Sequence, residues 1–278
     1  MPVVTPHTLT VNGYPMAYLE TPAPPGATGA PLVLVHGSLC DCRYFKPQMA
    51  PLAERRRVVS VSLRHYWPDA WDGKGDTFSA EQHAEDLAAF IGALGEGPVH
   101  LLGHSRGGYV AMRAALMAPD TVRSLMLADP GIELSGGPSD VSFDSGRGGF
   151  RERAHAAIEA GDIDGGLALF IDTVSGPDTW RRMVPWFKRM VRDNALTLIG
   201  QVKEPRTPLP IDALGALQAP VLLLGGALSP APYPAILDAL AQALPDARRM
   251  MIPQASHGMN LANVVAFNRA VEAFIGQA

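Results

Sequence analysis

Short apolar runs alternate with longer amphipathic stretches along most of the chain. Runs dominated by aliphatic residues, with little alternation, are typical of strands buried on both faces of a parallel sheet. They cover residues 31–37, 57–63, 99–103, 124–130, 220–226 and 248–253. Near the start of the chain, residues 7–11 and 14–20 flank Asn12-Gly13, a turn sequence that predicts a β-hairpin.

Amphipathic stretches between these runs predict helices. They cover residues 45–54, 79–95, 109–119, 233–244 and 262–278. One of them shows both end signals, because Ser79 is a good N-cap and Gly95 a good stop. Buried strands that alternate with helices predict a mostly parallel sheet with helices on both faces.

The alternation breaks in the middle of the chain. Residues 131–213 contain no convincing strand and begin with a Gly/Ser-rich loop. Helical stretches follow at 150–160, 162–174 and 177–196. We therefore expect an α/β core built from residues 1–130 and 214–278, with a helical cap inserted at residues 131–213 after the sixth strand.

Polar residues with chemical potential stand where the predicted strands end. They are His36-Gly37-Ser38, Ser105, Asp129 and His257, each following a different strand. Functional groups in open α/β sheets collect at the carboxyl ends of the strands, so we expect these residues to lie together.

These residues resemble the motifs of the α/β-hydrolase superfamily, and the resemblance covers nearly the whole chain. Gly103-His104-Ser105-Arg106-Gly107 resembles the G-x-S-x-G nucleophile elbow, and His36-Gly37 resembles the oxyanion-side motif. Residues 253–271 resemble the closing histidine loop and helix. The resemblance implies an α/β-hydrolase fold with a mostly parallel eight-stranded sheet, and a capped serine hydrolase or esterase.

The resemblance also implies roles for individual residues. Ser105 would be the nucleophile, and His257 would accept its proton. The backbone amides of Ser38 and Arg106 would stabilise an oxyanion, and the His36 ring would fix the loop that carries Ser38. The simpler alternatives are that Ser105 only caps the next helix and that His257 is a surface loop histidine.

The acid partner of His257 departs from the commonest family pattern. Ser229 occupies the usual acid position, and no carboxylate lies between Val221 and Asp238. Some members of the family carry the acid after the preceding strand, where this chain has Asp129. We therefore expect Asp129 to pair with His257, and the alternatives are an acid elsewhere or a Ser-His dyad.

Aromatic residues supply candidates for a substrate pocket. Tyr66 and Trp67 belong to a bulky loop that either covers the sheet edge or lines an acyl pocket. In the expected cap, Trp180, Trp186 and Phe187 recur at helical spacing, which fits packing as well as a pocket. Together with Phe143 and Phe170, some of these side chains are expected to form an apolar roof.

Composition restricts the class of partner. The net charge is −4 and no basic run occurs, so nucleic acid and anionic membranes are not expected partners. No window reaches the length of a membrane span, and the N-terminus lacks the pattern of a signal peptide, so we expect a cytoplasmic protein. The only cysteines, Cys40 and Cys42, are too few for a zinc site, and we expect neither metal nor cofactor.

The leading hypothesis is a serine hydrolase that cleaves a carboxylic ester or lactone of a small to medium, partly apolar molecule. Capped C–C bond hydrolases use the same parts and remain an alternative. In a cofactor-free dioxygenase of this fold, His257 would deprotonate an aromatic hydroxyl and Ser105 would only form hydrogen bonds. A non-catalytic binder on the same scaffold is the third alternative. Epoxide hydrolases and haloalkane dehalogenases are disfavoured because they need a carboxylate where this chain has Ser105.

Overall fold

The computed structural model describes residues 5–75, 77–136, 142, 144, 147–205 and 207–278. Within these residues, eight strands form one sheet in the order β1-β2-β4-β3-β5-β6-β9-β10. Their bounds are His7–Val11 (β1), Tyr14–Thr21 (β2), Gly29–Val35 (β3), Arg56–Val61 (β4), Val99–His104 (β5), Val122–Ala128 (β6), Val221–Gly226 (β9) and Ala247–Ile252 (β10). Strand β2 pairs antiparallel with β1 and β4, and the other neighbours are parallel. This confirms the predicted mostly parallel sheet of eight strands.

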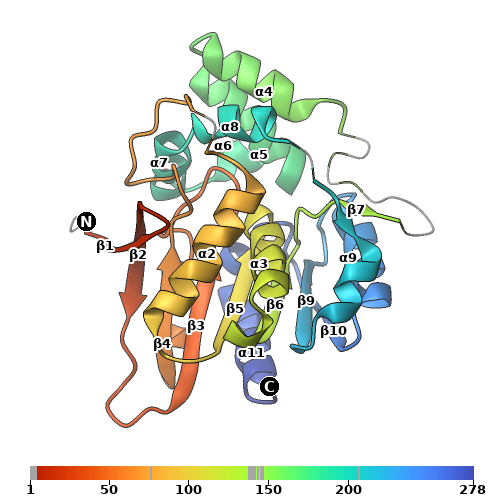
Figure 1. Cartoon of the computed structure of the whole chain (residues 1–278). Helices are drawn as coiled ribbons and strands as arrows, with labels where there is room; N and C mark the ends of the chain where they lie inside the picture. The colour runs from red at the N-terminus through yellow and green to blue at the C-terminus, as the bar shows by residue number, and fades with distance from the viewer. Residues whose placement is uncertain (1–4, 76, 137–141, 143, 145–146, 206) are drawn as a thin grey trace.

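Helices cover both faces of the sheet (Figure 1). One face carries α2 (Ala80–Leu94), α3 (Arg106–Met117) and α9 (Tyr233–Ala243). The other carries α1 (Lys46–Leu52), the short α10 (Met259–Ala262) and α11 (Val264–Ile275). Short 3₁₀ segments cover Pro119–Thr121 and Ile211–Ala216.

Strand β3 illustrates why the sheet is buried on both sides. Its side chains point alternately to opposite faces. Leu32 and Leu34 belong to the apolar cluster that contains α1 and α11, whereas Val33 and Val35 belong to the cluster that contains α2 and α3. All four side chains are inaccessible to solvent. A continuous aliphatic run is therefore what this position requires.

The segment between β6 and β9 is mainly helical and lies over one end of the sheet (Figure 1). Its helices are α4 (Phe150–Glu159), α5 (Ile163–Ser175), α6 (Thr179–Arg182), α7 (Pro185–Asp193) and α8 (Thr197–Lys203). Where the segment leaves and rejoins the core, β7 (Leu134–Ser135) and β8 (Leu209–Pro210) pair in parallel. The expectation of no strand in this segment was therefore wrong. Strands of two residues are too short to show a period of two in the sequence.

Two expected helices have different bounds in the structure. The helical stretch at 177–196 becomes α6 and α7, because Pro185 starts a new helix and the preceding Val184 is extended. The helix expected at 262–278 is α11 and begins only at Val264, because the Asn263 side chain accepts a hydrogen bond from the Ala266 amide and caps it. Both differences follow local chemistry that hydrophobic periodicity does not register.

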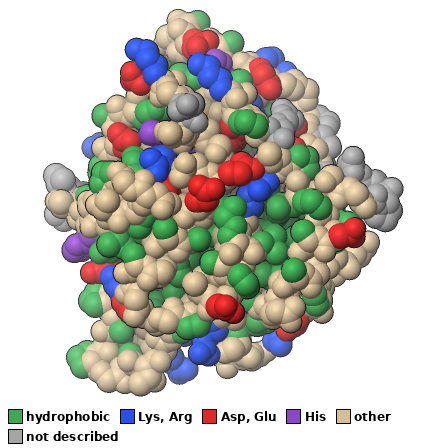
Figure 2. All heavy atoms as spheres, viewed as in Figure 1, with side chains coloured by type: hydrophobic (Ala, Val, Ile, Leu, Met, Phe, Trp, Pro, Cys, Tyr) green, Lys and Arg blue, Asp and Glu red, His purple; other side chains and the backbone are tan. Residues whose placement is uncertain are grey.

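The surface and the helices add two observations. Figure 2 shows acidic and basic side chains interspersed over the face that carries α2 and α3, rather than gathered by sign. Among the described helices, none combines the length and the apolar character needed to cross a bilayer.

The parallel strands position the residues selected from the sequence. The loops that follow β3, β5, β6 and β10 leave the sheet at the same edge, beneath the helices α4 to α8. These loops carry Ser38, Ser105, Asp129 and His257, respectively. The topology therefore brings together residues that lie far apart in the sequence.

Candidate active site

Ser105 occupies a strained turn between β5 and α3. Its φ and ψ are 53° and −122°, a conformation that side-chain-bearing residues rarely adopt. The flanking glycines permit the turn. A Cβ on Gly103 would lie 2.3 Å from the Gly107 carbonyl oxygen, and a Cβ on Gly107 would lie 2.3 Å from the carbonyl oxygens of Val35 and His36. Backbone strain at a serine between obligatory glycines is typical of a functional site.

Two backbone amides beside Ser105 are available to an anion. In the part of the chain that the structure describes, neither the Ser38 amide nor the Arg106 amide donates a hydrogen bond. The Arg106 amide lies at the N-terminus of α3, where the helix dipole favours negative charge. Among the described residues, no internal acceptor therefore occupies either of the amides expected to bind an oxyanion.

The His36 ring holds the loop that carries Ser38. The Leu63 amide donates to His36 Nε2 over 3.1 Å, so Nδ1 carries the proton and donates to the Gly37 carbonyl over 2.8 Å. Burial lowers the pKa of His36 to about 4, which keeps the ring neutral. His36 thus acts as a loop support, as its position in the sequence suggested.

His257 and Asp129 lie together beside Ser105. Nδ1 of His257 donates to Oδ2 of Asp129 over a long 3.4 Å. The Ser229 hydroxyl donates to the same carboxylate oxygen over 2.5 Å. The serine at the usual acid position is therefore a hydrogen-bond partner of the carboxylate that lies one strand earlier.

Burial dominates the electrostatics of this pair. It raises the pKa of Asp129 to about 7, although the Ser229 hydrogen bond opposes the rise. Burial also lowers the pKa of His257 well below its usual range, and the positive Arg147 lowers it further. At neutral pH the imidazole is neutral and able to accept a proton.

A residue that the sequence interpretation missed contacts the other nitrogen of His257. The Tyr233 hydroxyl lies 3.1 Å from His257 Nε2, and the two rings stack with centroids 4.2 Å apart. Tyr233 is the first residue of α9, four positions after Ser229. A triad acid is a carboxylate, so a tyrosine in that stretch of the sequence gives no signal of a role beside His257.

His104 connects the Ser105 turn to the loop of His257. Its Nε2 donates to the His257 carbonyl oxygen over 2.8 Å, and the two rings lie 4.5 Å apart. Burial lowers the pKa of His104 to about 3, so this ring is also neutral. The contact fixes the backbone of His257 relative to the turn.

A cavity of about 640 Å³ opens beside Ser105 and His257. Most of its wall is apolar and comes from the helical segment and from loops of the core. Apolar lining residues include Phe170, Ile171, Val174, Met183, Val184, Trp186, Phe187, Leu228 and Leu261. Trp186 and Phe187 therefore lie where an apolar roof was expected.

Phe170 also lines this cavity, whereas Tyr66, Trp67 and Trp180 do not, and Phe143 lies outside the described residues. Tyr66 is buried edge-on against His36, with ring centroids 4.7 Å apart. The Arg43 guanidinium covers the Trp67 ring at 3.9 Å. Trp180 is buried in the apolar core beneath Lys188 and Arg192. The pocket role expected for Tyr66, Trp67 and Trp180 is therefore corrected to packing.

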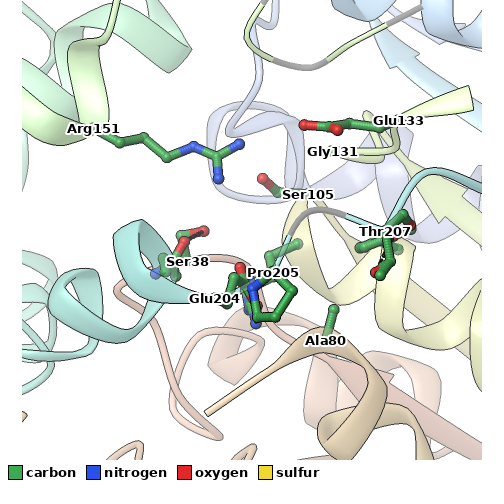
Figure 3. Close-up of a pocket in the computed structure, with 12 residues that line it drawn as sticks. Ser38, Ala80, Ser105, Gly131, Glu133, Arg151, Glu204, Pro205 and Thr207 are labelled. Atoms are coloured by element: carbon green, nitrogen blue, oxygen red, sulfur yellow. Dashed lines mark hydrogen bonds and ion pairs between the residues drawn. The ribbon is translucent and has the colours of Figure 1, made fainter. Parts of the chain in front are cut away.

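On another side of Ser105 lies a recess of about 50 Å³ with a more polar lining (Figure 3). Arg151 of α4 and Glu133 reach toward it from one side, and Ser38 and Glu204 lie on the opposite side. The recess is small enough to hold only a few waters or one small polar group.

Helix α8 and the residue that follows it, Glu204, contact both residues that carry the available amides. The Ser38 hydroxyl donates to Gln201 Oε1 over 2.7 Å. The buried Arg106 guanidinium forms a two-pronged ion pair with Glu204, one bond measuring 2.7 Å. Gln201 and Glu204 were not singled out from the sequence, because the spacing of polar residues on a short helix does not reveal a distant partner.

The described part of the chain contains no grouping of three or more His, Cys, Asp or Glu side chains arranged to hold a metal ion. The convergent groups are instead a hydroxyl, neutral imidazoles, a carboxylate and backbone amides. This set can activate a serine and stabilise a developing oxyanion without further ligands from the protein.

Comparison with known proteins identifies the family of the chain. The profile of the alpha/beta hydrolase family matches residues 32–270. The chain is 25% identical over 272 residues to the sn-1-specific diacylglycerol lipase ABHD11 of Mus musculus, covering 90% of this chain and 82% of that protein.

Solved structures share the fold over nearly their whole length. A hydrolase from Pseudomonas aeruginosa PA01 superposes with a TM-score of 0.78 and 23% identity, covering 99% of both chains. The enol-lactonase from Burkholderia xenovorans LB400 superposes with a TM-score of 0.78 and 19% identity, covering 97% of this chain and 99% of that chain. The chain belongs to the alpha/beta hydrolase family and is an enzyme of that family.

Proposed function

We propose that the protein is a serine hydrolase that cleaves a carboxylic ester or lactone through an acyl-enzyme on Ser105. The observation that carries the proposal is the convergence of Ser105, His257 and Asp129 at one sheet edge, beside two backbone amides that donate to no acceptor among the described residues. The names of the relatives, a diacylglycerol lipase and an enol-lactonase, support an ester or lactone as the substrate class.

The chemistry follows from these groups. Ser105 Oγ attacks the carbonyl carbon while its proton passes to His257, and Asp129 stabilises the resulting imidazolium. The amides of Ser38 and Arg106 hold the oxyanion of the tetrahedral intermediate. The proton then goes to the leaving alkoxide. A water activated by His257 repeats the sequence on the acyl-enzyme and releases the acid.

The cavity and the recess beside Ser105 suggest where different parts of a substrate would bind. The cavity of about 640 Å³ accommodates a medium-sized apolar acyl or alcohol portion. The polar recess of about 50 Å³ accommodates at most a small group or waters. We propose that residues 131–213 act as the cap, because α5, α7 and the link between α6 and α7 supply much of the apolar wall.

A fluorophosphonate reacts with activated serines, so intact mass after labelling tests the proposal directly. We expect one adduct on the wild-type protein and none on Ser105→Ala. Esters and lactones of increasing chain length would then define the substrate range. A folded wild-type protein that gains no adduct would contradict the proposal. If the same protein consumed oxygen with a heteroaromatic substrate, cofactor-free dioxygenase chemistry would replace it.

A further inference from the structure

Ser229 follows β9 and contacts the acid of the candidate site, although the chemistry described above does not use it. Its hydroxyl oxygen lies 2.5 Å from Oδ2 of Asp129. An ionised carboxylate only accepts hydrogen bonds, so the serine is the donor. Nδ1 of His257 donates to the same oxygen over 3.4 Å. Ser229 therefore acts on the carboxylate oxygen that faces the base.

The backbone around Ser229 holds its hydroxyl in this direction. The Ser229 amide donates to the Gly226 carbonyl over 3.0 Å, and the Leu228 amide donates to the Ala255 carbonyl over 2.9 Å. A Cβ on Gly226 would lie 2.6 Å from Ser229 Oγ, so glycine at that position leaves room for the hydroxyl. These contacts fix the loop after β9, and its hydroxyl meets the Asp129 carboxylate, which comes from the end of β6.

Asp129 depends on hydrogen bonds to stay ionised, because its side chain is fully buried. Burial raises the pKa of Asp129 to about 7, and the Ser229 hydrogen bond is the largest of the contributions that oppose this rise. Other titratable and charged side chains also interact with the carboxylate, namely His104, His257, Arg147, Tyr44 and Tyr233. A substitution that removes only the Ser229 hydroxyl keeps all of them, so its effect can be measured separately.

We propose that Ser229 is a positioning residue that holds Oδ2 of Asp129 toward His257 and keeps the carboxylate ionised, an inference that rests on the proposed hydrolase function. When His257 takes the proton of Ser105, the charge of Asp129 stabilises the imidazolium, and a neutral carboxyl group cannot supply that charge. Ser229 lines neither the cavity nor the recess, so it acts through Asp129 and not on the substrate.

Ser229→Ala tests the proposal through the pH dependence of kcat/KM for an aryl ester. Without the hydroxyl, the pKa of Asp129 rises, so the decline of kcat/KM at low pH should begin at a higher pH. A hydrogen bond to a charged group predicts a midpoint raised by roughly one pH unit. On that basis kcat/KM should fall about fivefold at pH 7 and stay within about twofold of the wild type at pH 9.

Ser124→Ala is the matched control. It removes another serine hydroxyl that is hydrogen-bonded to a titratable side chain, His100 Nδ1 at 2.7 Å, outside the cavity and the recess. Its pH profile should coincide with that of the wild type. An unchanged midpoint in Ser229→Ala would overturn the proposal, and so would an equal loss of activity at every pH. If Ser229→Ala does not fold, Ser229→Cys keeps most of the bulk with a weaker donor, and its midpoint must rise as well.

The outcomes also separate the two proposals. Wild-type protein that gains no fluorophosphonate adduct would remove the hydrolase function and the role of Ser229 with it. Labelling and ester hydrolysis that depend on Ser105, with a midpoint that Ser229→Ala leaves in place, would remove only the role of Ser229.

Discussion

The turn around Ser105 and the helical segment α4 to α8 both border the reactive serine, but they are held in place differently. Backbone packing fixes the turn, because a Cβ at Gly103 or Gly107 would collide with carbonyl oxygens. The Ser105 amide also donates to the Ala128 carbonyl over 3.0 Å, and the Gly131 amide donates to the Ser105 carbonyl over 2.9 Å. Little in this turn can move without moving the sheet.

Side chains hold the helical segment against the core. Gln201 accepts from Ser38, Glu204 pairs with Arg106, and the Asn194 side chain donates to Asp41 over 2.7 Å. Between these contacts, most of the cavity wall is made of apolar side chains. We therefore expect substitutions in the turn and in its acid–base pair to cause large losses of stability or activity. Substitutions in the helical wall should cause only small changes in activity.

The largest effect is expected at Asp129. Asp129→Asn removes the charge that would stabilise the His257 imidazolium, so kcat/KM should fall by roughly 10²- to 10⁴-fold. Because burial raises the pKa of Asp129 to about 7, the wild-type kcat/KM should also decline below an apparent pKa near that value, which belongs to the coupled pair. Steady-state rates between pH 5 and 9 measure both effects. A variant with wild-type activity would assign the acid to another residue.

Asp129→Asn should lower activity but raise the stability of the fold relative to the wild type as the pH increases. The native carboxyl holds its proton up to about pH 7, whereas an unfolded Asp loses it near pH 4. The wild type should therefore lose stability as pH rises from about 4 to 7, because the unfolded state binds fewer protons there. Asp129→Asn should be spared this loss, and its Tm relative to the wild type should rise over that range. Thermal unfolding at pH 5 and 8 checks the sign.

An intermediate effect is expected at Gly107. A methyl group there would lie 2.3 Å from two carbonyl oxygens, so Gly107→Ala should lower the free energy of unfolding by about 3 kcal/mol or more. Gly92→Ala is the matched control, since a Cβ at that position in α2 meets nothing within 4 Å. It should be neutral or stabilising. Guanidinium unfolding measures the free energy of unfolding of both variants. Equal values would show that the backbone of the turn can shift to accommodate the methyl group.

The smallest effect is expected in the helical wall. Trp186→Ala enlarges the apolar cavity without touching the acid–base groups, so KM should rise a few-fold for long-chain esters and remain nearly constant for acetate esters. Trp71→Ala removes another half-buried tryptophan that lies outside the cavity, and KM should not depend on chain length. A fall in kcat for every ester would instead mean that Trp186 supports the reacting groups.

The local hydrophobic pattern of the sequence predicted the strands of the sheet well, but it did not predict which side chains line the cavity. Aliphatic runs located the strands, and flanking glycines located the Ser105 turn, because both express backbone requirements of a few neighbouring residues. The aromatic stripe of residues 180–187 was divided, with Trp186 and Phe187 on the cavity and Trp180 in the core. Which side of a helix faces a cavity depends on how the helix is rotated against distant neighbours.

The sequence by itself determined the order of strands and helices, the strained turn at Ser105 and the strand ends that carry Asp129 and His257. Tertiary structure alone decided that Ser229 donates to Asp129, that Tyr233 lies on His257, and that Gln201 and Glu204 brace Ser38 and Arg106. The physical reason is one of range. Backbone conformation and burial are encoded over a few residues, whereas these contacts join side chains 24 to 163 positions apart, which only the folded chain brings within hydrogen-bonding distance.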